Sequence, residues 1–274
     1  MFPILGTVDE GLSAALGFVR AYRGLCVIFM LTYLAAAGVG ISGWVELPLP
    51  LWLSGLALTW GLGAIGLLIL APVWTALFRF TVLGDSARRY WQFDSRTRRV
   101  ALVQFIMAVV MLIGATPFAL GLDVLPLVAG RRLIVGIVVL IAFLTKYAGF
   151  WLNARLAIAP AMAASGTRAQ SMDTSWAYTR WSSFKILLML VLVFLPTLCI
   201  SAFFLVLAIV LHFPPGSFAA SVLTACTVIG TTLSAATSEL VWGTVSGRLA
   251  VKLVQANRQR AAELAKEQLE RGLS

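Results

Sequence analysis

The stretch between Lys185 and Glu239 carries no formally charged side chain, and a Pro-Pro-Gly turn at 214–216 divides it near its middle. A helix needs roughly 20 apolar residues to cross a hydrocarbon core of about 30 Å. Charged residues make up only 12% of the whole chain, against about 25% in soluble domains. The sequence therefore predicts two membrane-spanning helices here, at about 186–211 and 217–243.

The same search for long uncharged segments predicts four further spans. Polar gaps between the spans are too short to form a stable domain of their own. We therefore expect one membrane domain over residues 1–274, an all-α polytopic bundle of six transmembrane helices. The four additional spans cover about 24–45, 51–78, 100–122 and 133–154.

Basic residues indicate the orientation of the bundle. Lys and Arg gather at the two ends of the chain and in the connections at 84–99 and 155–184, whereas the alternate connections hold only Arg131 and Arg132. By the positive-inside rule, both termini are predicted to be cytoplasmic. The net charge of +10 then reflects membrane topology, and we expect no nucleic-acid partner.

Both ends of the chain have the pattern of interfacial helices. In residues 9–23, Leu12, Leu16 and Val19 recur at helical spacing with polar residues on the other side. Such a helix can lie on the membrane surface before the first span. Residues 245–272 form a second amphipathic segment, predicted to be a cytoplasmic tail helix.

The chain lacks the residue sets that catalysis or metal binding requires. His212 is the single histidine, and the three cysteines all fall within predicted spans at no metal-ligand spacing. Neither a phosphate-binding glycine loop nor a nucleophile with a neighbouring base is present. We expect no enzymatic activity, no cofactor and no metal.

Two charged residues lie inside predicted spans. Lys146 falls in the fourth span and Glu239 in the sixth. An intramembrane charge costs about 2.5–3.5 kcal/mol on insertion scales, so a partner or a function is expected. Their matching depths allow an ion pair between Lys146 and Glu239; snorkelling to the interface and an ion or proton pathway are the alternatives.

The connection after the fourth span is rich in basic and tryptophan residues. Pro160 is expected to bend the chain as it leaves the membrane, and Asp173 or Thr174 can cap a short helix behind it. Trp and Arg fit a segment that lies under the bilayer. The residues predicted to contact lipid head groups are Arg155, Arg168, Trp176, Arg180, Trp181 and Lys185.

Three short motifs in this chain resemble a bacterial membrane-protein family. They are Arg155-Leu-Ala-Ile-Ala-Pro160-Ala, Ser175-Trp176-Ala-Tyr-Thr179-Arg180-Trp181 and Arg79-Phe-Thr-Val-Leu-Gly84-Asp85. That family includes the membrane domain fused to some glycerophosphodiester phosphodiesterases and related six-span inner-membrane proteins. The resemblance implies a helical bundle in the bacterial inner membrane. It does not transfer phosphodiesterase activity, because the soluble catalytic domain of those enzymes has no counterpart here.

Two functions remain open from the sequence. The first is a non-enzymatic integral inner-membrane protein whose basic cytoplasmic face engages anionic lipid or a membrane-protein partner. The alternative is a small secondary transporter or channel that uses Lys146 and Glu239. If the first function is correct, charge substitutions in the connection at 155–184 should impair it. If the second is correct, substitutions of Lys146 and Glu239 should impair it instead.

Overall fold

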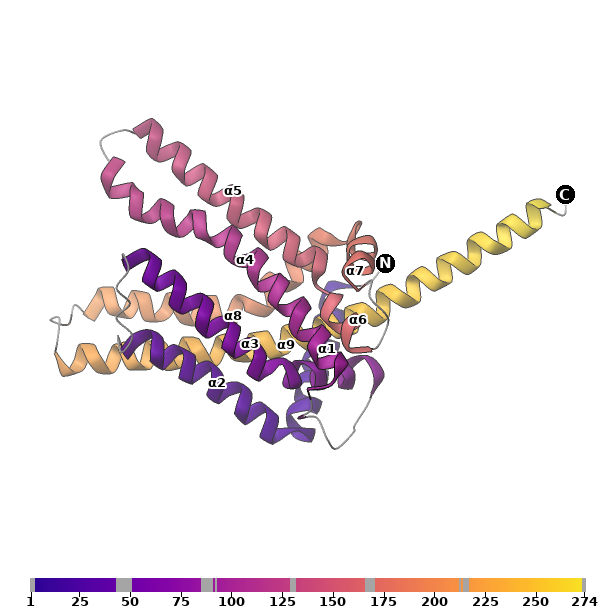
Figure 1. The fold of residues 1–274 in the computed structure, drawn as a ribbon, viewed down its shortest axis with the longest axis horizontal. Coiled ribbons are helices and arrows are strands. Elements are labelled where there is room, and N and C mark those ends of the chain that lie inside the picture. The colour runs from indigo at the N-terminus through magenta and orange to yellow at the C-terminus, as the bar shows by residue number, and fades with distance from the viewer. Residues whose placement is uncertain are drawn as a thin grey trace.

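The computed structural model describes residues 3–42, 51–84, 91, 93–128, 132–165, 171–211, 213 and 217–272. In these residues the fold is all helical, as predicted (Figure 1). The helices are α1 (Ile4–Ala21), α2 (Arg23–Ser42), α3 (Leu51–Leu83), α4 (Ser95–Val128), α5 (Arg132–Leu156), α6 (Ala159–Ser165), α7 (Ser171–Thr179), α8 (Ser183–Leu211) and α9 (Phe218–Gly272).

Several of these helices are long and apolar enough to cross a membrane. Within the described residues, four segments pass by length and composition, and a fifth span is possible if the bent pair α1 and α2 counts as one. The four segments are Ile65–Leu83, Ile134–Ser165, Ser183–Leu211 and Phe218–Glu263. A multi-pass helical membrane protein follows from this; the count of six spans and the cytoplasmic position of the termini stay predictions.

Helix α1 turns sharply into α2, with an angle of 104° between them. Its small residues Gly11, Ala14 and Ala15 are buried, whereas Leu12 and Leu16 are exposed. Helix α1 packs mainly on α9. Helix α1 therefore points its leucines away from the other helices; its interfacial position on the membrane stays a prediction.

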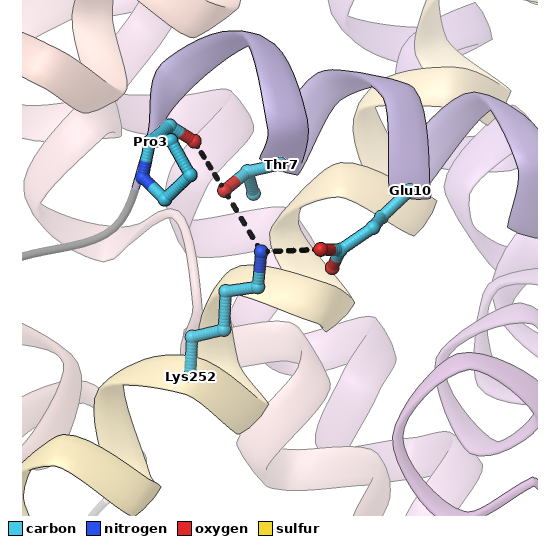
Figure 2. Close-up of polar contacts among 4 residues, drawn as sticks. All are labelled: Pro3, Thr7, Glu10 and Lys252. Carbon is cyan, nitrogen blue, oxygen red and sulfur yellow. Dashed lines mark hydrogen bonds and ion pairs between the residues drawn. The ribbon is translucent and has the colours of Figure 1, made fainter.

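Polar contacts attach α1 to α9 (Figure 2). Lys252 Nζ of α9 lies 2.8 Å from Glu10 Oε1 and donates a hydrogen bond of 3.2 Å to Thr7 Oγ1. The Thr7 hydroxyl in turn donates to the carbonyl oxygen of Pro3 at 2.8 Å. Exposed ion pairs contribute only about 0.2–1 kcal/mol, so this contact serves mainly to position the start of α1 along α9.

Helix α9 is a single helix of 55 residues. The sequence predicted a span at 217–243 and a separate tail helix from 245, but the structure shows no break between them. The stretch around this boundary contains no proline, and its Gly243 and Gly247 pack against α3 within the helix. The last part of α9 extends away from the other helices instead of folding back along them (Figure 1).

The buried core lies where α1, α2, α3, α4, α6 and α9 meet. Its aromatic centre comprises Phe18 of α1, Phe29 of α2, and Trp74 and Phe78 of α3. The rings of Phe29 and Trp74 meet edge to face with centroids 5.4 Å apart, a favourable aromatic geometry. Gly84 directly follows α3, and its φ of +65° lies in the left-handed region, which glycine adopts without strain because it has no Cβ.

Asp94 caps the N-terminus of α4. Its Oδ1 accepts hydrogen bonds from the backbone N–H groups of Thr97 at 2.7 Å and Arg96 at 3.0 Å. Burial acts to raise the pKa of Asp94, but these hydrogen bonds outweigh it and lower the pKa below its ordinary value. The ionised form is therefore the one that stabilises the helix end.

We expect Asp94→Ala to lower the free energy of unfolding by about 1 kcal/mol, the usual cost of losing an N-cap. Asp94→Asn keeps the acceptor and should retain most of that stability. Because the pKa is lowered in the folded state, the contribution of the charge is complete above about pH 4 and is lost as the pH falls below it. Thermal unfolding in detergent at several pH values measures this; equal stability of the Ala and Asn variants would show that Asp94 is not a cap.

Candidate functional site

The segment from Arg155 to Lys185, called the elbow below, begins where α5 ends. Helix α5 stops at Leu156, and α6 starts at Ala159 after two intervening residues, with Pro160 in its first turn. Proline has no N–H to continue the ladder of α5, but its fixed φ suits the start of a helix. The bend predicted at Pro160 is therefore present, as a complete break between two helices.

This break exposes the carbonyl group of Arg155, which α7 satisfies. Ser175 Oγ donates to the Arg155 carbonyl oxygen at 2.9 Å and Thr179 Oγ1 donates to the same oxygen at 2.8 Å. One turn further, Ser183 Oγ donates to the carbonyl oxygen of Thr179 at 2.9 Å. The three hydroxyls follow at intervals of four residues, two on α7 and one at the start of α8, and are all buried. They hold α7 and the start of α8 against the end of α5.

The Arg155 side chain lies within this junction. Its residue is only 3% exposed, and the guanidinium carbon lies 4.2 Å from the ring centroid of Trp176 and 5.6 Å from that of Trp151. Nη1 contacts Ser183 Oγ at 3.4 Å, whereas Nε has no hydrogen-bond partner among the described residues. Stacking on tryptophan faces stabilises a cation by about 0.5–2 kcal/mol, so the rings compensate for part of the desolvation of Arg155.

The outer side of the elbow is basic and aromatic. Trp181 is 85% exposed and Phe184 is 74% exposed, and the Arg180 guanidinium carbon lies 5.3 Å from the Trp181 ring centroid. Arg180 is exposed and Lys185 is partly buried. Large aromatic side chains beside cations at the start of an apolar helix are typical of the boundary between membrane and water.

The structure places the predicted head-group residues differently. Trp176, Arg180 and Trp181 are exposed, and Lys185 lies in the first turn of α8. Arg155 lies beneath the Trp176 ring, so a head-group contact at Arg155 requires that ring to move; the contact stays a prediction. Arg168 lies outside the described residues, as does His212.

Sequence reasoning did not identify the residues that hold the elbow together. These are Trp151, Ser175, Thr179 and Ser183. A signal was available, because the hydroxyls recur every four residues and Trp151 precedes Arg155 by the same interval.

Glu239, one of the two predicted intramembrane charges, lies on α9, and its carboxyl contacts α2. The Tyr33 hydroxyl of α2 donates a hydrogen bond to Glu239 Oε2. Lys146 lies on α5, whose main contacts are with α4, α7 and α8. Its predicted ion pair with Glu239 stays a prediction.

In the described part of the chain, no group of three or more His, Cys, Asp or Glu side chains is arranged to hold a metal ion. Comparison of the chain with protein-family models, curated proteins and solved structures finds no match.

Proposed function

We propose that this chain is a non-enzymatic integral protein of the bacterial inner membrane whose basic, tryptophan-bearing cytoplasmic face engages anionic lipid. The observation that supports this most directly is the outer side of the elbow, where exposed Trp181 and Phe184 alternate with Arg180 and Lys185. The aromatic rings can insert at the level of the head groups, and the cations can lie against phosphate.

The inner side of the elbow gives this surface a defined shape. Three hydroxyls and the Arg155 guanidinium join α5, α7 and α8 directly. A surface held in place loses little conformational freedom when it binds. In this proposal Arg155 positions Trp176 and α7, and the exposed residues contact the lipid.

The charge of the elbow also favours an anionic partner. Asp173 is the single acidic residue between Asp123 and Glu239, and it lies on the exposed side of α7. Basic residues near an anionic membrane surface contribute about 1 kcal/mol each, less at high salt. A membrane-protein partner with an acidic surface is the second partner that this charge allows.

The double variant Arg180→Gln/Lys185→Gln tests the lipid proposal. It should lose most of the preference of the purified protein for phosphatidylglycerol over phosphatidylcholine. Two lost cations correspond to about 2 kcal/mol, or about a thirtyfold change in relative affinity. Native mass spectrometry of lipids retained from mixed micelles measures the preference at low and high salt.

The matched control is Arg258→Gln/Arg260→Gln, which removes the same charge from the exposed end of α9. This control should keep the lipid preference of the unchanged protein. An unchanged preference in the elbow variant would overturn the proposal. An equal loss in both variants would also overturn it, because net charge and not the elbow would then govern lipid binding.

The alternative, a small transporter or channel that uses Lys146 and Glu239, has one supporting observation. The Glu239 carboxyl has a hydrogen-bonded partner on a second helix, as residues on proton or ion pathways commonly do. Its own test is flux through proteoliposomes, which the Glu239→Gln change should abolish if this function is correct.

A further inference from the structure

Glu239 lies on the apolar part of α9, on the N-terminal side of the contact with α1. Helix α1 meets α9 at Gly11 and Val245, six residues beyond Glu239. At 1.5 Å per residue, the carboxyl-bearing position is about 9 Å deeper along α9 than that contact. Glu239 is also the single acidic residue between Asp173 and Glu263, so no second carboxylate on α8 or on the apolar part of α9 shares its environment.

The surroundings of Glu239 are aromatic and uncharged. Tyr33 donates its hydroxyl to the carboxyl, and the Tyr33 ring packs on Phe29 at 5.0 Å between centroids. Phe29 in turn meets Trp74 of α3. Among the elements that pack on this part of α9, α2 has no charged residue after Arg23, α8 has none after Lys185, and α3 has none before Arg79.

The negative charge of a carboxyl in such a place can be removed or compensated. A bound proton removes it, and a neighbouring cation compensates it; Lys146 on α5 is the predicted cation. A carboxylate left charged in an apolar environment is costly, because a single hydroxyl donor does not replace its hydration. The partner that the structure shows is a hydroxyl, which can hydrogen-bond a protonated carboxyl without any counter-ion.

We propose that Glu239 and Tyr33 form a proton-binding site between α2 and α9, in which the Glu239 carboxyl carries a proton at neutral pH. The ligand of this site is the proton itself. Loss of the proton leaves a carboxylate beside Tyr33, whose ring packs on Phe29, and this weakens the contact between α2 and α9. The site does not depend on the lipid-binding elbow, and it gives the alternative transport function a defined chemical step: uptake and release of one proton.

Labelling with dicyclohexylcarbodiimide tests this directly. The reagent adds to protonated carboxyls in apolar surroundings and leaves a stable N-acylurea, and peptide mass spectrometry identifies the labelled residue. In the full-length protein in lipid nanodiscs at neutral pH, Glu239 should be labelled strongly and the exposed Glu263 of the same helix should not. Labelling of Glu239 should fall as the pH is raised.

Two variants separate the proton from the ion pair. Tyr33→Phe removes the donor that stabilises the carboxylate, so labelling of Glu239 should extend to higher pH. Lys146→Met should leave the labelling unchanged. The proposal is overturned if Glu239 becomes reactive only after Lys146→Met, because the carboxyl is then ionised in the unchanged protein. If Glu239 is labelled no more than Glu263 in every variant, the infrared measurement below decides.

Infrared difference spectroscopy keeps the proposal testable if the reagent is excluded sterically. A protonated carboxyl has a distinct C=O stretching band. That band should be present at neutral pH and absent from the Glu239→Gln variant; its absence from the unchanged protein would overturn the proposal.

Discussion

Replacing Gly11 with alanine should detach α1 from α9 and lower the temperature of unfolding in detergent. A Cβ at this position would lie 2.3 Å from Val245 Cγ2 and 3.0 Å from Val245 Cα. The Val245 side chain can rotate about its Cα–Cβ bond and move Cγ2 away. The Cα atom of Val245 belongs to the backbone of α9 and cannot move without shifting the helix. Overpacking of this kind costs about 1–3 kcal/mol, and it also disturbs the hydrogen bond that Thr244 donates to the Gly11 carbonyl oxygen at 2.8 Å.

Gly24→Ala is the matched control for this change. Gly24 is also helical, in α2, but no heavy atom lies within 4 Å of a Cβ built there. Alanine is a better helix former than glycine by up to about 1 kcal/mol, so Gly24→Ala should leave stability unchanged or raise it. If both variants unfolded at the same temperature as the unchanged protein, the close contact between α1 and α9 would be absent.

The elbow should show a strongly non-additive response to the loss of its hydroxyls. Ser175 Oγ and Thr179 Oγ1 both lie within hydrogen-bond distance of the Arg155 carbonyl oxygen, and the Thr179 proton is shared with the Ser175 carbonyl oxygen at 2.7 Å. Ser175→Ala or Thr179→Val alone therefore leaves the Arg155 carbonyl with one hydroxyl partner. The double variant leaves a buried carbonyl unsatisfied, which costs about 1–3 kcal/mol. We therefore expect the double variant to lose more stability than the sum of the two single variants.

Thr227→Val is the control for the removal of a hydroxyl from a helix. Thr227 Oγ1 donates at 2.7 Å to the carbonyl oxygen of Leu223, within the regular part of α9, where that carbonyl already accepts a helix hydrogen bond. This control should change stability little. Thermal unfolding of all four variants in one detergent measures the cycle, and strictly additive losses would show that the two hydroxyls do not share an acceptor.

The helical membrane fold could be predicted from the sequence because lipid imposes a simple requirement. A segment without charge that is long enough to cross the bilayer must be a helix, since only a helix satisfies its own backbone there. The charge-free stretch before Glu239 therefore marks α8 and the first part of α9, and the gap before Arg79 marks most of α3. The segment before Arg155, interrupted only by Lys146, marks α5. The sequence also predicted a bend at Pro160, because the missing N–H acts locally; the structure has a complete break between Leu156 and Ala159.

The end of the last span could not be predicted in the same way. The change from apolar to polar residues near 245 marks where the surroundings change, not where the helix ends. No residue there breaks a helix, so α9 continues to Gly272. Amphipathic pattern alone does not distinguish a separate surface helix from the projecting end of a span.

For the candidate site, the sequence by itself determined the chemistry, and the tertiary structure decided the geometry. The clustering of Arg and Trp between 155 and 185 identified the elbow without any coordinates. Only the fold placed Trp176 over Arg155, since the two lie on different helices and the intervening break sets their approach. Likewise, the sequence matched Glu239 to Lys146 because both are charged. The structure shows the Tyr33 hydroxyl beside the Glu239 carboxyl, because α2 packs against α9. The search for intramembrane charges could not find Tyr33, because its side chain is uncharged.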